Sequence, residues 1–412
     1  MAKDYPLAPL GKYVSVQGGF AFKSSDFKDS GVPVLKIKNV RLRDVDTSEV
    51  EYVAEDVAKS ATRYRCKTGD LLISMTGSGI HAPNSVVGRV ARFTGPSDRF
   101  LINQRVGRFV LKDPTKLDSR YLFYVLTQGE CQSTLVSIAT GSANQVNISG
   151  GQIESMEIPL PPLSEQRAIA YVLGTLDDKL DLNRQMNETL EAMEQALFKS
   201  WFVDPTENGL PEGWRESTIG QEVGVAGGST PSTKNARFWE DGTIHWATPR
   251  DLSSLANPVL LDTARRISDA GLTQISSGLL PRGTVLLSSR APIGYLAISE
   301  VAVAVNQGFI AMVCDQALPN YYVQLWARAN MDLIEANANG TTFLEISKSN
   351  FRPLPVVVPP KAMLDSFVDQ VEPLHQKLVA NLRESLTLAA LRDGLLPKLL
   401  SGELRGVPHD LN

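Results

Sequence analysis

The chain carries the same plan twice, and this internal repeat constrains its fold more than any other feature. The stretch "GKYVSVQGGFAF" from residue 11 corresponds to "GQEVGVAGGSTP" from residue 220, and both contain a Gly-Gly turn. Further pairs follow in the same order along the chain: "GDLLISMTG" and "GTVLLSSRA", "INQRVGRFVL" and "VNQGFIAMVC", "SRYLFYVLTQ" and "PNYYVQLWAR", "ATGSANQVNIS" and "NANGTTFLEIS". Chance similarity rarely keeps this order, so we predict a tandem duplication.

A proline pair closes each copy. The two junctions read "IPLPPLSEQ" from residue 158 and "VVVPPKAML" from residue 356. Proline has no N–H to extend a sheet ladder, and the residue before a proline is pushed out of the helical region. Each pair therefore ends a strand and sets the point where a long helix begins.

Each copy mixes short β-type runs with helices. Gly, Pro, Asn and Ser punctuate the runs, which predicts an α+β domain of about 160 residues. A chain of 412 residues is long enough for two or three such cores. The predicted segments are a first domain at 1–162, a helix at 163–203, a second domain at 204–358, and a helix with a tail at 359–412.

The first long helix is predicted over about 164–202, with Ser164 as its cap. Its apolar stripe contains a slip through Leu182 and Met186, which predicts one stutter in a coiled-coil seam. The other stripe residues are Ile169, Leu173, Leu176, Leu180, Leu190, Met193, Leu197 and Trp201.

The second long helix is predicted over about 361–400, and Pro373 is expected to kink it or to end a short first piece. Its stripe consists of Leu364, Phe367, Val371, Leu374, Leu378 and Leu382. A long helix with one apolar stripe is not stable alone. The two helices are therefore expected to pair as an antiparallel coiled coil with pseudo-twofold symmetry.

The charge distribution limits how the chain could contact a polyanion. The net charge is −4, made up of +4 over residues 1–162, −3 over 163–203, −4 over 204–358 and −1 over 359–412. If the chain binds DNA, its phosphate contacts are few and local, or a partner supplies the rest.

Neither a disulfide framework, a membrane span nor a catalytic motif is predicted. Cys66, Cys131 and Cys314 are odd in number and form no CxxC pair. No apolar run is long enough to span a bilayer and no secretory signal is evident, which favours the cytoplasm. Walker A, HExxH, GxSxG, GxGxxG and Asn/Asp-Pro-Pro-Phe/Tyr motifs are absent. The histidines His81, His245, His375 and His409 lie on separate segments, which argues against a metal site or a triad.

Several segments in a fixed order carry a resemblance to a known family. They are "IPLPPLSEQRAIAYVLGTLDDKLDLNRQMNETLEAMEQALFKSWF" from 158, "FWEDGTIHWATPRDL" from 238, "GTVLLSSRAPIG" from 283, "VNQG" from 305 and "LRDGLLPKLLSGEL" from 391. Over essentially its whole length the chain resembles the specificity (S) subunit of type I restriction-modification enzymes.

The resemblance implies two target-recognition domains, each reading one half of an interrupted site in double-stranded DNA. It implies that the paired helices act as spacer and as docking surface for two methyltransferase (modification) subunits, which helicase-nuclease (restriction) subunits join. It also implies a non-catalytic chain without cofactors of its own, with S-adenosylmethionine, ATP and magnesium on the partner subunits.

Two other functions remain open on the sequence alone. A rod-like scaffold that binds protein partners would explain the acidic balance equally well. An enzyme that acts on DNA unaided is disfavoured by the missing motifs.

DNA-contacting residues are expected on loops, because Arg or Lys reads guanine and Asn or Gln reads adenine. In the first copy the candidates are Lys36, Lys38, Asn39, Arg41, Thr76, Ser78, Asn103, Gln104, Arg105, Ser142 and Asn144. In the second copy they are Thr248, Arg250, Ser289, Arg290, Asn306, Gln307, Thr341, Thr342 and Lys348. The alternatives are a solvated strand end for the first four and an ordinary hairpin loop at Thr76 and Ser78 and at their counterparts Ser289 and Arg290. For the Asn-Gln pairs the alternative is a structural cap or loop clamp, and for the loops at 140–145 and 339–342 it is simple turn chemistry.

Overall fold

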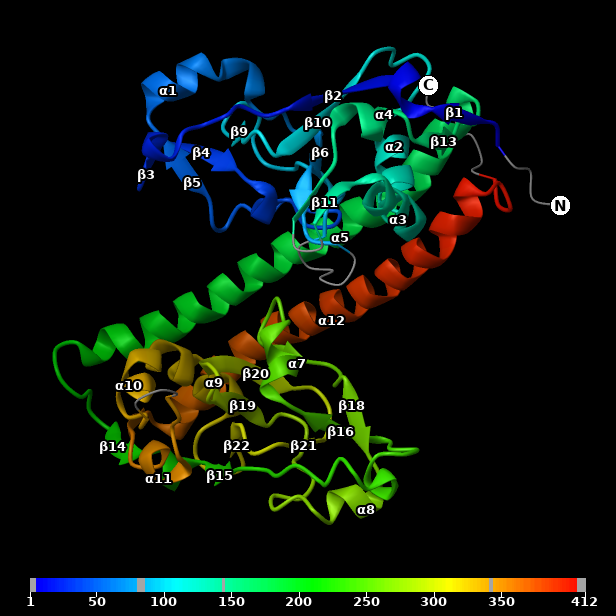
Figure 1. Cartoon of the computed structure of the whole chain (residues 1–412). Coiled ribbons are helices and arrows are strands. Elements are labelled where there is room, and N and C mark those ends of the chain that lie inside the picture. Colours follow the sequence, from blue (N-terminus) through cyan, green and yellow to red (C-terminus); the bar gives the residue numbers. More distant parts are fainter. Residues whose placement is uncertain (1–4, 80–85, 143–144, 341–343, 406–412) are drawn as a thin grey trace. The chain divides into compact units, whose positions relative to one another are not determined.

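The chain forms two compact units. The computed structural model describes residues 5–79, 86–142, 145–340 and 344–405. Unit 1 comprises Met1–Leu180 with Thr387–Asn412, and unit 2 comprises Asp181–Leu386. Each unit contains one globular part together with a segment of both arm helices, α5 (Leu163–Phe198) and α12 (Lys361–Leu400) (Figure 1).

The described residues of unit 1 form two four-stranded sheets and two smaller ones. The first sheet is antiparallel, with the order β2 (Val14–Gly18), β10 (Val106–Leu111), β6 (Leu71–Ser74) and β8 (Val90–Arg92). The second has the order β3 (Phe27–Lys28), β5 (Glu51–Val53), β4 (Val32–Leu35) and β9 (Leu101–Ile102). The smaller sheets are β11 (Thr140–Ser142), β12 (Gln145–Asn147) and β7 (Thr76–Gly77), and β1 (Leu7–Pro9) with β13 (Glu157–Pro159).

The helices of unit 1 supply much of its core. They are α1 (Glu55–Ser60), α2 (Ser119–Leu126), α3 (Gly129–Ile138) and α4 (Gly150–Glu154). Asp118 caps α2 by accepting hydrogen bonds from two backbone N–H groups of its first turn. Tyr121 and Tyr124 of α2 are buried in one cluster with Leu173 of α5 and Leu396 of α12. The arm helices are therefore part of the hydrophobic core of unit 1.

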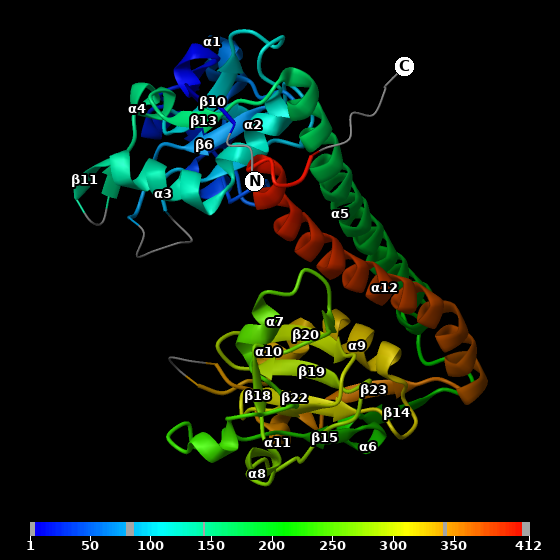
Figure 2. The same cartoon turned by 90° about the vertical axis from the view of Figure 1, so that its right-hand side faces the viewer.

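Unit 2 is built around a five-stranded sheet (Figure 2). Its order is β15 (Gly224–Ala226), β22 (Phe309–Val313), β19 (Val285–Ser289), β20 (Ile293–Ser299) and β17 (Val259–Leu260). A second sheet contains β18 (Arg265–Ile267), β16 (Ile244–Ala247) and β21 (Val303–Val305), and a third pairs β14 (Arg215–Thr218) with β23 (Pro355–Val358). The helices are α6 (Ile219–Glu222), α7 (Pro249–Ser253), α8 (Asp269–Leu272), α9 (Asn320–Ala329), α10 (Met331–Ala336) and α11 (Lys348–Phe351).

The predicted tandem α+β duplication is confirmed by the strand order. The order β2-β10-β6-β8 in unit 1 recurs as β15-β22-β19-β20 in unit 2. The parallel pair β4 and β9 recurs as the parallel pair β16 and β21. The strand that precedes each proline pair, β13 or β23, pairs with the first strand of its own copy.

Both Gly-Gly turns bring two backbone segments too close for a side chain. A Cβ atom added to Gly19 would lie 2.3 Å from the carbonyl oxygen of Asn103. A Cβ atom added to Gly228 would lie 1.6 Å from the carbonyl oxygen of Val305. Glycine is therefore required where each turn crosses the end of the strand that leads into the Asn-Gln pair.

The structure corrects the predicted cap of α5 and excludes one of the two outcomes expected at Pro373, the end of a short first piece. Helix α5 begins at Leu163, and the carbonyl oxygen of Pro162 accepts hydrogen bonds from Glu165 N (2.9 Å) and Gln166 N (3.0 Å). Ser164 thus lies inside the first turn and does not cap the helix. Pro373 does not end a first piece, because α12 continues through it.

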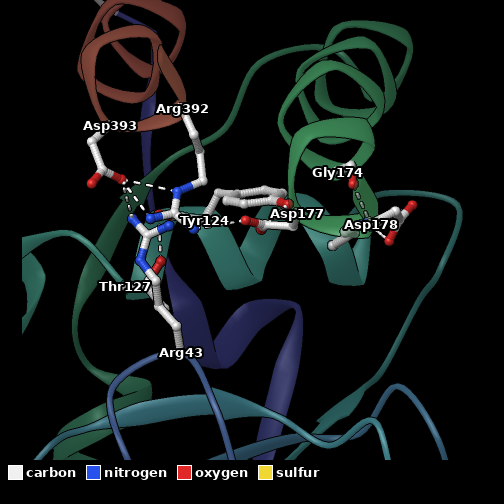
Figure 3. A network of polar contacts seen from close by, with 9 residues as sticks. Arg43, Tyr124, Thr127, Gly174, Asp177, Asp178, Arg392 and Asp393 are labelled. Carbon is white, nitrogen blue, oxygen red and sulfur yellow. Dashed lines mark hydrogen bonds and ion pairs between the residues drawn. The ribbon is translucent and has the colours of Figure 1, made fainter. Parts of the chain in front are cut away.

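The arm helices contact each other in both units, and within unit 2 they run antiparallel, because Asn183 bonds to Glu384 whereas Glu194 pairs with His375. In unit 1 Asp177 of α5 pairs with Arg392 of α12, and in unit 2 Glu194 of α5 pairs with His375 of α12. Figure 3 shows the unit 1 contact, where Asp177 accepts hydrogen bonds from Arg392 Nη1 (2.8 Å) and Tyr124 Oη (2.6 Å). Arg43 of the globular part forms an ion pair with Asp393 of α12 at 3.8 Å.

The predicted stutter in α5 is wrong. It was inferred from apolar residues alone, whereas polar residues occupy several of the buried positions of the helix. Leu182 and Met193 are 50% and 46% exposed, whereas Asn183, Asn187 and Glu194 are buried. The inward-facing positions alternate spacings of three and four without interruption: Ile169, Leu173, Leu176, Leu180, Asn183, Asn187, Leu190, Glu194, Leu197 and Trp201. In α12, likewise, Asn381 is fully buried and Leu382 only half-buried. This pattern is a regular heptad repeat.

Candidate nucleic-acid interface

In unit 1 three predicted loops meet at one place through backbone hydrogen bonds. Asn103 N donates to the carbonyl oxygen of Leu35 at 2.9 Å, which ties the Asn-Gln turn to the end of β4. Met75 N donates to the carbonyl oxygen of Arg105 at 2.9 Å, and Ile148 N donates to that of Met75 at 3.0 Å. Segments from residue 35 to residue 148 are therefore assembled into one surface.

The same three bonds recur in unit 2. Asn306 N donates to the carbonyl oxygen of Ala247 at 3.0 Å, and Ser289 N donates to that of Gly308 at 2.8 Å. Ile346 N donates to the carbonyl oxygen of Ser289 at 3.0 Å. The loops that follow β16, β19 and β21 are thus joined in the same way, close in sequence to Lys348 at the start of α11.

The turn after β4 matches the turn after β16. Lys36 N donates to Asn39 Oδ1 at 2.9 Å, and Thr248 N donates to Asp251 Oδ2 at 2.7 Å. Lys38 and Arg250 then occupy the same position in these two capped turns. Both are exposed, with the Lys38 ammonium 3.9 Å from Glu49.

Asn39 has a structural role, which corrects its assignment as a base-reading residue. Its side chain is only 2% exposed. Its Oδ1 accepts from Lys36 N, and its Nδ2 donates to the carbonyl oxygens of Asp46 (2.8 Å) and Glu49 (2.9 Å). Both N–H donors and one lone pair of the amide oxygen thus hold the loop, and burial keeps the side chain away from a base.

Lys36 and Arg41 differ in their availability. The Lys36 ammonium pairs with Glu51 and lies 3.9 Å from the centroid of the Phe27 ring, so this half-buried residue also holds the loop. Arg41 is exposed and lies 3.5 Å from Asp46. Hydrogen bonds from Ser48, with a smaller contribution from Arg41, lower the pKa of Asp46, which keeps that carboxylate charged.

Three of the predicted hydroxyl groups are held inside the fold. Thr76 is 5% exposed and donates to Asn147 Oδ1 at 2.7 Å, and Ser289 is 3% exposed at the end of β19. Thr248 Oγ1 donates to Asp251 Oδ2 at 2.7 Å. Burial or capping thus replaces the expected DNA contact at these positions. Ser78 is half-buried, and its carbonyl oxygen accepts from Val87 N at 3.1 Å.

The Asn-Gln turns combine a clamp with exposed donors. Asn306 Oδ1 accepts from Gly308 N at 2.9 Å, so the loop-clamp interpretation holds for that side chain. Gln307 is exposed, and its Oε1 accepts from Thr230 Oγ1 at 2.6 Å. Of the remaining candidates, Gln104, Arg105 and Lys348 are exposed and Asn103 is half-buried. The side chain of Arg290 is 38% exposed and lies 3.4 Å from Glu345, and Ser142 belongs to β11. Asn144, Thr341 and Thr342 lie outside the described residues.

Sequence reasoning missed a basic pair in unit 2. Arg265 and Arg266 are exposed on β18, and Arg265 lies opposite Trp246, near the end of β16. The Arg265 guanidinium stacks 3.6 Å from the centroid of the Trp239 ring. The two adjacent arginines are visible in the sequence, but the net charge of −4 over residues 204–358 drew attention away from them.

The described part of the site offers donors for a polyanion, and the cysteines of the chain lie away from its loops. Burial raises the pKa of Cys66 to about 12, of Cys131 to about 11 and of Cys314 to about 12, which keeps these thiols protonated. Within residues 5–79, 86–142, 145–340 and 344–405, no group of three His, Cys, Asp or Glu side chains could hold a metal ion. Across the same part of the chain, no helix has the length and apolar character needed to cross a membrane.

Comparisons with known proteins identify the family and the fold. The model of the type I restriction modification DNA specificity domain matches residues 4–192 and 211–385. The type I restriction enzyme MjaIX specificity subunit of Methanocaldococcus jannaschii is 24% identical, over 98% of this chain and 94% of its own. The HindI specificity subunit of Haemophilus influenzae is 23% identical, over 98% and 99%. A type I restriction-modification S subunit from M. genitalium has the same fold, with a TM-score of 0.61, 17% identity and 96% of each chain covered.

Proposed function

Since the chain belongs to the family of type I restriction-modification DNA specificity subunits, we propose that it reads a bipartite site in double-stranded DNA, one half-site per recognition domain. The recognition domains are residues 1–162 and 204–358, and the arm segments are 163–203 and 359–412. The observation that carries the proposal is the repeated set of three backbone bonds that assembles the same loops in each unit.

The chemistry of the exposed side chains supports this role. Unit 1 presents Lys38, Gln104 and Arg105 on turns held by backbone bonds, and unit 2 presents Arg250 and Gln307 at corresponding positions. Lysine and arginine suit guanine or phosphate, and glutamine suits adenine. The two units carry different side chains on one scaffold, so they are expected to read different half-sites.

Partner subunits complete the proposed activity. The chain is non-catalytic and cytoplasmic in this proposal, and its arm helices dock two methyltransferase subunits, which helicase-nuclease subunits join. S-adenosylmethionine, ATP and magnesium belong to those partners. The net charge of −4 supports this division, because a chain with few phosphate contacts depends on its partners for much of its DNA affinity.

Neutralising Lys38 or Arg250 is expected to alter recognition of one half-site only. Lys38→Gln should weaken binding by about 1–3 kcal/mol if the side chain reads a base, and should relax the sequence preference in the half-site read by unit 1. If the side chain contacts phosphate, the slope of log K against log salt falls by about 1 instead. Arg250→Gln should do the same for the other half-site.

The measurement is DNA binding by the chain reconstituted with methyltransferase subunits, together with the methylated motif in the genome of an expressing host. Lys116→Gln is the matched control, because Lys116 is exposed in the turn before α2. A change in both half-sites from one substitution would contradict the assignment of one domain to each. Partner binding without DNA binding or methylation would favour the protein scaffold.

A further inference from the structure

A layer of asparagines interrupts the apolar core of the arm within unit 2. Asn183 and Asn187 of α5 and Asn381 of α12 are at most 2% exposed. Asn183 Nδ2 donates to Glu384 Oε2 at 2.8 Å and to Ser385 Oγ at 3.2 Å. Asn381 Nδ2 donates to Asn187 Oδ1 at 2.9 Å. The amides of Asn187 and Asn381 thus face each other across the helix pair, and the amide of Asn183 bonds to the next turn of α12 and, at 3.4 Å, to the carbonyl oxygen of Asn381.

Stability alone does not account for this layer. Burying an amide is costly unless it is fully hydrogen-bonded, and among the described residues no partner reaches Asn183 Oδ1 or Asn381 Oδ1. Leucines at these positions would continue the apolar stripe on either side, from Leu180 to Leu190 on α5. Replacing both partners of a buried hydrogen bond by apolar groups of the same shape can be nearly neutral or stabilising.

The hydrogen bonds exist in one register only. In the observed pairing Asn187 faces Asn381, and Leu190 packs in the same cluster as Leu378. Leu374 and Leu388 lie seven residues before and after Asn381. If α12 slid by one heptad in either direction, one of these two leucines would therefore face Asn187. Its amide would then be buried against an apolar side chain with no acceptor.

We propose that Asn183, Asn187 and Asn381 form a register-determining layer that selects one alignment of α5 against α12. A single buried asparagine layer has this effect in coiled coils, where it fixes register at a cost in stability. One heptad is about 10 Å along a helix, or about 3 base pairs of DNA. One consequence rests on the proposed function: the layer also sets the spacer length between the half-sites, because each arm helix continues directly from one recognition domain.

Disulfide trapping in the full chain tests the register without any DNA. A disulfide between the cysteines of Leu190→Cys and Leu378→Cys reports the observed alignment, and we call this double variant the native-register pair. Leu190→Cys with Val371→Cys, and Leu197→Cys with Leu378→Cys, report slips of one heptad in the two directions and are the slipped pairs. Mapping the cross-linked peptides by mass spectrometry separates these bonds from any that involve Cys66, Cys131 or Cys314.

With the native layer, only the native-register pair is expected to close. After Asn183→Leu, Asn187→Leu and Asn381→Leu, at least one slipped pair should rise from background to a yield comparable with that pair, while the Tm rises by several degrees. If the triple variant does not fold, Asn187→Leu with Asn381→Leu removes the central bond alone. Gln185→Leu, exposed on the same stretch of α5, is the control and should behave like the wild type.

Two results would overturn the inference: slipped pairs that close with the native layer, or leucine variants that close only the native-register pair. Methylation mapped in cells that carry the partner subunits then addresses function separately, with extra spacer lengths expected for the leucine variants. If the leucine variants change register and the wild type with its partner subunits shows no DNA recognition, the proposed function is contradicted and the register inference stands.

Discussion

His375→Leu is expected to lower the free energy of unfolding of unit 2 by about 3–5 kcal/mol at neutral pH, the usual effect of removing one partner from a buried ion pair. His375 is 3% exposed. Its Nδ1 lies 3.7 Å from Glu194 Oε1 on α5, and its Nε2 lies 3.6 Å from Glu300 Oε1, just beyond β20. Without the imidazolium, these two buried carboxylates lose the cation between them.

The effect of this substitution should depend on pH. Burial acts to lower the pKa of His375, but the carboxylates of Glu194 and Glu300 outweigh it and raise the pKa from 6.5 to about 9. Because the folded state holds the proton more tightly, the stabilisation is complete below pH 6.5 and is lost as the pH rises to about 9. The size of this loss is on the order of 3 kcal/mol.

Two arginines and a tyrosine also lie around the contact between His375 and Glu300. Arg282 lies 2.7 Å and Arg383 lies 3.7 Å from Glu300 Oε2. Burial and nearby carboxylates, among them Glu372, raise the pKa of Tyr321 to about 12, and its ring centroid lies 5.1 Å from that of His375. The pKa of Tyr321 thus lies above the range over which His375 is expected to lose its proton.

Urea denaturation of the wild type and of His375→Leu at pH 6, 7.5 and 9 measures this prediction. The difference in unfolding free energy should shrink as the pH rises. His245→Leu is the control for loss of a histidine, because His245 is half-buried near the more exposed Asp262. A pH-independent difference would show that packing, and not the charge of His375, stabilises the contact.

Gly228→Ala is expected to destabilise unit 2 by about 3 kcal/mol, the upper end of the usual range for overpacking. The added Cβ would lie 1.6 Å from the carbonyl oxygen of Val305 and 2.9 Å from Val305 Cγ2. Relief requires a backbone shift, which would also disturb the bond from Ser229 N to that carbonyl (3.1 Å). The Asn-Gln turn begins at the next residue, so the site should be displaced as well.

Thermal and urea unfolding of Gly228→Ala, compared with Gly224→Ala, measure this effect. A Cβ atom on Gly224 would meet its nearest neighbours at 3.5 Å, an ordinary contact distance, so this control should be nearly neutral. In unit 1 Gly19→Ala should be destabilising for the same reason. Equal effects for Gly228→Ala and Gly224→Ala would mean that the Gly-Gly turn relaxes without cost.

The loops of the candidate site were predictable, whereas the roles of their individual side chains were not. Gly-Gly turns, Asn-Gln pairs and proline pairs recur in fixed order, so the residues that assemble each surface stand out in the chain. Asn39 and Lys38 are neighbours in one loop, yet one is buried and the other exposed. The direction of each side chain depends on the turn that caps β4, which composition does not specify.

The sequence by itself determined the duplication, the α+β class, the helix starts near the proline pairs and the family, because these depend on local chemistry repeated in order. Only the tertiary structure decided which face of each arm helix is buried. The stripe of leucines suggested a stutter through Leu182, but the helix pair buries Asn183, Asn187 and Glu194 instead. The reason is physical: a buried polar side chain needs hydrogen-bond or ion-pair partners, and here those partners lie on α12, far away in the chain.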